Sequence, residues 1–217
     1  MVIDRLEPRK SALGTRPRGG GGWRDEGASC KALRLMDRYE PLRHRTIALV
    51  GLMGVGKSSV GRRLANALEL PFRDADSEVE AAAGRAITEI FSELGEAAFR
   101  DGERRVIQRL LDEPPHVLAT GGGAFVNDET RALLKSKALV VWLRADLELL
   151  ARRVGRKDTR PLLKDSDPLT VLKAQAEQRY PLYAQAHVVV DTGDTAHHVT
   201  VAQVIDALTE HLAKEGS

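Results

Sequence analysis

Residues 46–58 read TIALVGLMGVGKS, and this stretch decides the fold. A short apolar run leads into a glycine-rich turn that matches the pattern G-x-x-x-x-G-K-[ST]. In that pattern, backbone N–H groups surround phosphate oxygens and the start of the next helix adds positive potential. Val60, Leu64 and Leu68 follow at helical spacing, so the turn lies between a strand and a helix. The sequence therefore predicts a nucleoside triphosphate site.

The loop assigns a role to each of its polar side chains. Lys57 is expected to neutralise charge on the β- and γ-phosphates, and the Ser58 hydroxyl to ligate the Mg²⁺ carried by the nucleotide. The residues expected to bind the nucleotide are Gly51, Met53, Gly54, Val55, Gly56, Lys57, Ser58 and Ser59. The loop alone does not distinguish a kinase from an ATPase or a GTPase.

The rest of the chain alternates strand-like and helical patterns. Further strands are expected at 72–74, 117–120, 138–143 and 187–190, and helices from Ser77, from Thr88 to before Pro114, and over 128–135, 147–154, 169–180 and 199–212. Alternating strands and helices predict a three-layer α/β/α fold with a central parallel sheet of about five strands, the phosphate-loop kinase architecture. Ligands of such sheets bind at the carboxyl ends of the strands. We therefore expect the residues after Val50, Arg73 and Thr120 to face one another.

Composition limits the class of protein. The 217 residues are 42% hydrophobic with a formal net charge of +2, which is ordinary for a globular protein with one core. The single cysteine, Cys30, rules out an intrachain disulfide and a Cys-rich metal site. No apolar run approaches the roughly 20 residues that span a bilayer, and no secretory signal begins the chain. We expect a cytoplasmic protein with no membrane partner.

Residues 1–45 differ from the rest. They contain eleven Lys/Arg against six Asp/Glu, and four consecutive glycines. Such a segment buries too little surface to offset its ordering entropy, so we expect a disordered, basic, Gly/Arg-rich extension before a domain at 46–217. Mixed charge and the lack of an aromatic stacking platform disfavour a nucleic-acid partner, and the acidic residues disfavour a transit peptide. Translation from Met36 is an open alternative.

Acidic residues follow the second expected strand, at Asp74-Ala75-Asp76. One carboxylate can serve a metal, and the other can accept hydrogen bonds from a polyol and orient an attacking hydroxyl. An acidic cluster at a helix start also complements the helix dipole. This pair alone therefore does not decide the function.

Two arginines and a glycine triplet complete the candidate acceptor site. Arg100 lies in FRDGE, Arg179 begins RYPLY, and residues 121–123 are GGG. Two guanidinium groups can bind a carboxylate as a fork, and glycines let backbone N–H groups approach a ligand closely. Each feature alone is weak, because a surface arginine is usually solvated.

Taken together, these motifs resemble shikimate kinase, a family within the nucleoside-monophosphate-kinase-like phosphate-loop proteins. The resemblance covers residues 46–212 approximately and includes RPLL at 160–163. It implies transfer of the γ-phosphoryl of MgATP to the 3-hydroxyl of shikimate, giving shikimate 3-phosphate and ADP, on the route to chorismate and the aromatic amino acids. It also implies a monomer.

The resemblance implies a role for each matching residue. Asp74 would assist Mg²⁺ through water beside Ser58, and Asp76 would hold the shikimate hydroxyls. Arg100 and Arg179 would bind the shikimate carboxylate, and the residues packing beside the ring would be Gly121, Gly122 and Gly123. The implied catalytic residues are Lys57, Asp76 and Arg160.

Residues 155–165 are charged and irregular, as expected of a lid that excludes water. The resemblance places Arg160 of this lid over the phosphates and Arg153 against the nucleotide. Residues 193–196 lack the basic residue and proline often found in the family, so we assign no adenine contacts.

Two alternatives remain at this point. A kinase for another polyol or sugar acid, such as gluconate, needs similar recognition, but the combination of FRDGE, GGG and RYPLY favours shikimate. A nonenzymatic sensor that binds nucleic acid through residues 1–45 is less favoured, because Lys57, Ser58, Asp74 and Asp76 are all present and no DNA-reading helix is evident.

Overall fold

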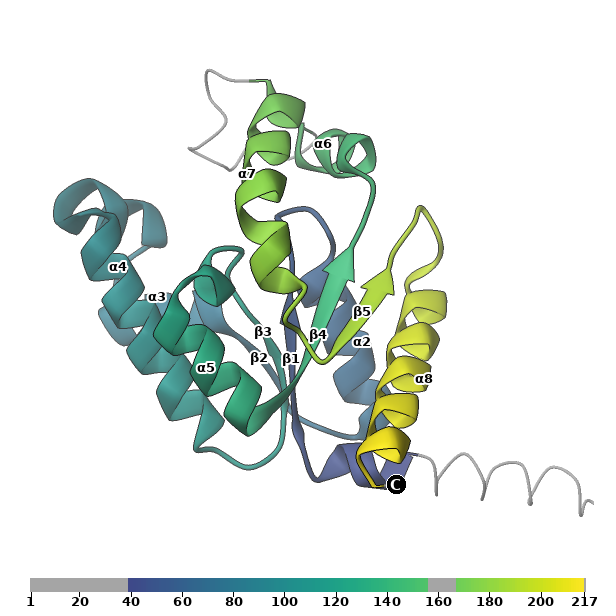
Figure 1. Cartoon of the computed structure of the whole chain (residues 1–217). Coiled ribbons are helices and arrows are strands. Elements are labelled where there is room, and N and C mark those ends of the chain that lie inside the picture. Colours follow the sequence, from purple (N-terminus) through teal and green to yellow (C-terminus); the bar gives the residue numbers. More distant parts are fainter. Residues whose placement is uncertain (1–38, 156–166, 217) are drawn as a thin grey trace, which may run out of the picture.

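A computed structural model describes residues 39–155 and 167–216. A sheet of five parallel strands in the order β2-β3-β1-β4-β5 forms its centre (Figure 1). The strands are β1 (Thr46–Val50), β2 (Phe72–Asp74), β3 (Val117–Ala119), β4 (Ala138–Arg144) and β5 (Val188–Asp191). The predicted parallel sheet is confirmed, and the structure adds the strand order.

Helices cover both faces of the sheet, as predicted. In Figure 1, α2 lies behind the sheet and α8 lies beside it at the β5 edge, whereas α5 lies in front, α7 lies near the upper ends of the strands, and α3 and α4 lie at the β2 side. The helices are α2 (Lys57–Leu68), α3 (Ala75–Ala83), α4 (Ile87–Leu111), α5 (Asp128–Lys137), α6 (Leu147–Gly155), α7 (Pro168–Tyr183) and α8 (His197–Glu215), with a short 3₁₀ helix η1 (Ala124–Val126). Among the described residues, no helix is long and apolar enough to cross a membrane.

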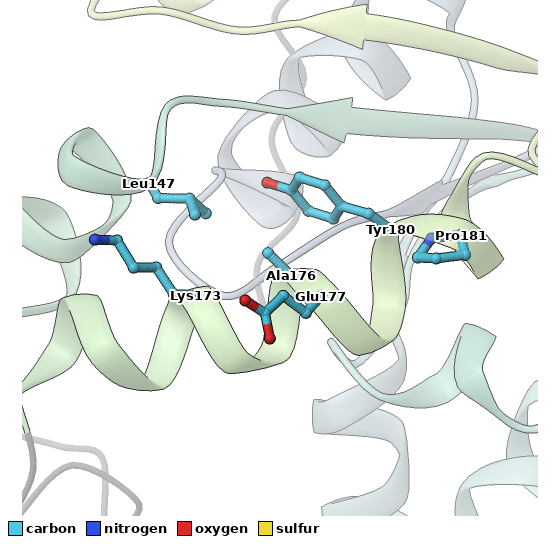
Figure 2. Close-up of a pocket in the computed structure, with 6 residues that line it drawn as sticks. All are labelled: Leu147, Lys173, Ala176, Glu177, Tyr180 and Pro181. Atoms are coloured by element: carbon cyan, nitrogen blue, oxygen red, sulfur yellow. The ribbon is translucent and has the colours of Figure 1, made fainter.

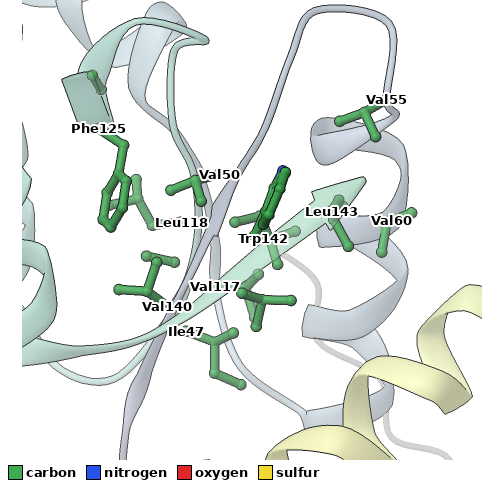
Figure 3. Packing of buried hydrophobic residues seen from close by; sticks show 14 of the residues in the cluster. Ile47, Val50, Val55, Val60, Val117, Leu118, Phe125, Val140, Trp142 and Leu143 are labelled. Carbon is green, nitrogen blue, oxygen red and sulfur yellow. The ribbon is translucent and has the colours of Figure 1, made fainter. Parts of the chain in front are cut away.

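The neighbouring strands β1 and β4 are buried on both faces. All residues of β1 are buried, as are residues 138–143 of β4, which explains why both read as nearly continuous apolar runs. Figure 3 shows side chains of these strands, including Ile47, Val140 and Trp142, packed with those of neighbouring elements. This rigid core fixes the carboxyl ends of the strands, where the polar motifs lie.

The N-terminal boundary differs from the prediction. Residues 39–43 are helical, and Leu42 is 0% exposed within the hydrophobic core. We expected these residues to belong to a disordered extension, because one buried leucine among charged neighbours leaves no periodic signal in the sequence. The ordered part therefore begins before Thr46, and residues 1–38 of the expected extension lie outside the described residues.

The start of α3 differs from the prediction, and side-chain caps explain the starts of both α3 and α5. The α3 helix begins at Ala75 rather than at the Ser77 capping box, because Asp74 Oδ1 accepts the Asp76 N–H at 3.2 Å. The α5 helix is capped by Asn127, whose Oδ1 accepts the Thr130 N–H at 2.9 Å. Within α4, Gly95 has a φ of 80° and marks a kink that the sequence did not reveal.

Candidate functional site

The phosphate-binding loop requires glycine at two close contacts. Gly51 has a φ of 139°, and a Cβ there would overlap the Leu143 carbonyl oxygen. Gly54 has a φ of 82°, and a Cβ there would lie 2.7 Å from Val154 Cγ2. The loop thus packs tightly against β4 and α6. The α2 helix begins at Lys57 without a side-chain cap, which leaves its first N–H groups directed at the loop.

Lys57 lies folded over its own loop. Its Nζ donates to the carbonyl oxygens of Gly51 at 2.8 Å and Leu52 at 3.2 Å. These contacts hold the ammonium group within the turn where phosphates bind in loops of this type. The nucleotide-binding residues predicted from the sequence therefore form one continuous loop and helix start.

Ser58 and Asp74 meet beside this loop. The Ser58 hydroxyl donates to Asp74 Oδ2 at 2.7 Å, which joins the start of α2 to the end of β2. A hydroxyl and a carboxylate at this distance are the oxygen donors that Mg²⁺ accepts alongside phosphate oxygens and water. The described residues thus fit a magnesium ion carried by a nucleotide.

The acceptor side centres on Arg100 and Glu103 of α4. Arg100 Nη1 donates to Glu103 Oε2 at 2.7 Å, and Arg100 Nε and Nη2 both donate to Glu96 Oε1. The guanidinium lies directly against Gly123, because a Cβ at Gly123 would be 2.5–2.8 Å from its atoms. Arg100 is therefore already oriented toward the glycine triplet.

Glu103 is a buried carboxylate at the centre of this arrangement. It is 2% exposed, and its Oε1 lies against Gly121 without a hydrogen-bond partner among the described residues. Asp76 Oδ1 approaches the same glycine, 2.9 Å from where a Cβ would stand. Burial raises the pKa of Glu103, and the charge of Asp76 adds to that rise while Arg100 opposes it.

Gly122 joins the two halves of the site. Its carbonyl oxygen accepts a hydrogen bond from Arg179 Nη1 at 3.2 Å. A Cβ on Gly122 would lie 3.8 Å from both the Gly51 carbonyl oxygen and the Met53 nitrogen. Gly122 therefore lies beside both Arg179 and the phosphate-binding loop, and the predicted convergence of the strand ends is found.

Comparison with known proteins identifies the family. A model of the family described as "Shikimate kinase" matches residues 53–209. A shikimate kinase of Caulobacter vibrioides is 72% identical over 80% of this chain and 87% of its own, and one from Paramagnetospirillum magneticum is 51% identical over 88% and 98%. The chain belongs to the shikimate kinase family. A structure of the Acinetobacter baumannii shikimate kinase in complex with shikimate superposes with a TM-score of 0.75 at 36% identity, covering 79% of this chain and 97% of that one.

Of the two arginines that the family resemblance assigns to the nucleotide, only Arg153 lies among the described residues. Arg153 of α6 donates from Nη2 to the Gly193 carbonyl oxygen at 2.8 Å and lies 3.8 Å from Asp194, so it bridges α6 and the loop after β5. Arg160 and residues 156–165 of the expected lid lie outside the described residues. The predicted acceptor residues lie together within the described part of this shikimate kinase fold.

Sequence reasoning assigned no role to Glu103 or Tyr183, although both lie in motifs that it quoted. The Tyr183 hydroxyl donates to the Gly122 carbonyl oxygen at 2.5 Å. Glu103 lies three residues after Arg100 on one helix, and this spacing was the available signal.

A separate hollow lies beside α7. It has a volume of about 360 Å³ and lies between the start of α6 and α7 (Figure 2). Its lining residues are Leu147, Lys173, Ala176, Glu177, Tyr180 and Pro181. None of them belongs to the site residues described above, so we do not include this hollow in the site of the shikimate kinase family.

Proposed function

We propose that this chain transfers the γ-phosphoryl group of ATP to the 3-hydroxyl of shikimate, giving shikimate 3-phosphate and ADP, on the route to chorismate and aromatic amino acids. Membership of the shikimate kinase family supports the reaction. The observation that carries it in the structure is Gly122, whose carbonyl oxygen accepts from Arg179 at 3.2 Å and on which a Cβ would lie 3.8 Å from the Gly51 carbonyl oxygen of the phosphate-binding loop.

The arginine pair recognises the substrate carboxylate. Arg100 and Arg179 reach the glycine triplet from α4 and α7, and two guanidinium groups bind a planar carboxylate in a directional way that lysine does not match. Gly121 lets the carboxylates of Asp76 and Glu103 approach the backbone, and Gly123 does the same for the Arg100 guanidinium, because a Cβ at either glycine would overlap these groups. Gly122 lies between them, and we assign all three glycines to the wall beside the substrate ring.

Asp76 orients the attacking hydroxyl. It lies beside Gly121 and close enough to Glu103 to influence its pKa, so it faces the same space as the arginine pair. Catalysis depends mainly on position and charge, because phosphoryl transfer through a loose transition state needs little covalent work from the protein. Lys57 stabilises negative charge on the transferred group.

Ser58 and Asp74 would hold the magnesium ion of MgATP, with Asp74 acting through water. A bound Mg²⁺ supplies charge neutralisation at the β- and γ-phosphates. The nucleotide also contacts Met53 and Val55 of the loop and Ser59 at the start of α2. Arg153 lies near the nucleotide, and Arg160 reaches it from the lid. We also propose a cytoplasmic, monomeric enzyme whose partners are shikimate and ATP.

Product analysis tests this function. The protein is incubated with MgATP and shikimate, and the product is examined by ³¹P-coupled proton spectroscopy to locate the phosphorylated carbon. We expect phosphate on the 3-oxygen together with one equivalent of ADP. Phosphate on another oxygen, or ADP release without a phosphorylated acid, would contradict the proposal.

A further inference from the structure

Tyr183 is a buried tyrosine to which the proposed reaction assigns no task. It ends α7 and is 1% exposed. Its ring packs against Trp142, at 5.8 Å between centroids, and Phe125, at 6.3 Å. A tyrosine enclosed by apolar rings needs a hydrogen-bond partner for its hydroxyl. That partner is the carbonyl oxygen of Gly122, at 2.5 Å.

Two donors from α7 converge on this one oxygen. Arg179 Nη1 also donates to the Gly122 carbonyl, at 3.2 Å. Arg179 and Tyr183 are four residues apart and therefore share a face of α7. The direction of the Gly122 carbonyl is thus set by α7, and the Tyr183 hydroxyl makes the shorter of the two contacts.

The direction of that carbonyl determines where the next N–H points. A trans peptide is planar, so the Gly123 N–H lies on the side opposite to the Gly122 carbonyl oxygen. Gly123 is also the residue against which the Arg100 guanidinium lies. The Ala124 N–H donates to the Gly121 carbonyl oxygen at 3.2 Å and closes a turn around this peptide. That bond is compatible with either orientation of the central peptide, and consecutive glycines allow both, so a contact from outside the turn is needed to favour one.

We propose that Tyr183 is a positioning residue for the acceptor: it orients the Gly122–Gly123 peptide so that the Gly123 N–H is presented to the substrate beside Arg100. The proposal deepens the function given above and rests on it. Tyr183 acts through the peptide and does not touch the substrate. Burial also raises the pKa of Tyr183, which keeps its hydroxyl protonated, and able to donate, at neutral pH.

Tyr183→Phe is the test, and Tyr180→Phe is its matched control. Both remove one hydroxyl from α7, and Tyr180 also packs against Trp142, with 5.0 Å between centroids. We expect Tyr183→Phe to raise the KM for shikimate roughly fivefold to tenfold, the equivalent of one hydrogen bond. The KM for ATP should change less than about twofold, because the proposed role concerns the acceptor alone. A general loosening of the protein would instead change the KM values of both substrates. Tyr180→Phe should leave both KM values unchanged.

Two kinetic results would overturn the proposal. An unchanged shikimate KM in Tyr183→Phe would show that the hydroxyl does not position the acceptor. Equal increases in both KM values would show a general packing defect.

Hydrogen exchange provides a readout that does not need turnover. With Tyr183→Phe, amide exchange in a peptide covering residues 121–123 should accelerate, and with Tyr180→Phe it should not. Unchanged exchange in Tyr183→Phe would overturn the orienting role. If the wild-type protein did not phosphorylate shikimate, the proposed function would fail, and the exchange comparison would still decide whether Tyr183 orients this peptide.

Discussion

The Ser58 hydroxyl donates a hydrogen bond of 2.7 Å to Asp74 Oδ2. The other oxygen of the same carboxylate, Oδ1, accepts the Asp76 N–H at 3.2 Å and caps α3. Asp74 therefore has two tasks with different demands. A helix cap needs only an acceptor, whereas a magnesium site also needs negative charge.

Asp74→Asn separates these tasks, because asparagine caps a helix as well as aspartate does. We expect the thermal midpoint to stay close to that of the wild type, and turnover or apparent Mg²⁺ affinity to fall about 10- to 100-fold. A Mg²⁺ titration of initial rates measures this. Asp74→Ala is the control and should also lose about 1 kcal/mol of stability with the cap. An unchanged Mg²⁺ dependence in Asp74→Asn would remove Asp74 from the metal site.

Arg100→Ala tests whether Arg100 binds the substrate carboxylate. The same substitution also removes the ion pair between Arg100 and Glu103, which affects stability. Glu103 is 2% exposed and would lose its 2.7 Å partner, and breaking a buried pair costs about 3–5 kcal/mol. We expect Arg100→Ala to lower the thermal midpoint and Arg100→Ala/Glu103→Gln to recover most of that loss. Both variants should raise the shikimate KM about 10- to 100-fold, as loss of a charged hydrogen bond implies. A stable double variant with the wild-type KM would exclude Arg100 from substrate binding.

Gly123→Ala should act on the acceptor without touching the nucleotide. Its Cβ would lie 2.5–2.8 Å from the Arg100 guanidinium, so the flexible arginine must move. We expect the shikimate KM to rise about tenfold with little change in the KM for ATP. Gly102→Ala is the control on α4, because no atom in the described part of the chain lies within 4 Å of its added Cβ. It should leave both KM values unchanged and stabilise the helix by about 0.5–1 kcal/mol. The same shikimate KM in both variants would contradict the close contact between Gly123 and the Arg100 guanidinium.

Stability should depend on pH through His187. Its Nδ1 accepts the Val140 N–H at 2.9 Å, which requires an unprotonated nitrogen. Burial lowers the pKa of His187 below its usual 6.5, with His211, Lys135 and Arg45 also lowering it and Glu215 opposing them. The unfolded chain then binds a proton more readily than the folded one. This contribution is complete above about pH 6.5 and is lost as the pH falls through the lower pKa of the folded protein.

His187→Asn tests this dependence, because the asparagine oxygen replaces Nδ1 as an acceptor but does not titrate in this range. The thermal midpoint is measured for both proteins from about pH 8 to about pH 5. The wild type should lose more stability on acidification than the variant does. Parallel curves would show that His187 does not contribute.

The parts of the fold that the sequence predicted are those with local signals. The apolar runs of β1 and β4 and the glycines of the phosphate-binding loop depend on neighbouring residues alone. Strand order could not be predicted, because pairing β3 between β1 and β2 depends on packing between distant segments. Leu42 was missed for a similar reason, since its burial comes from contacts with the core and not from its own segment.

The candidate site was predicted as a set of motifs but not as a network. Arg100 and Arg179 carried a chemical signal, because guanidinium groups suit carboxylates. Glu103 carried no such signal, because a glutamate in a helix usually faces solvent. Its burial becomes visible only when the fold places Gly121 against it. Asp74 was expected to serve a metal, while its second role as the α3 cap required the backbone geometry.

The most direct test of the central claim is a coupled ADP-release assay with MgATP and a panel of shikimate, quinate, gluconate and nucleoside monophosphates. The account predicts turnover on shikimate and background rates with the other acceptors. Turnover on another acceptor in preference to shikimate, or ATP binding without turnover on any of them, would contradict it.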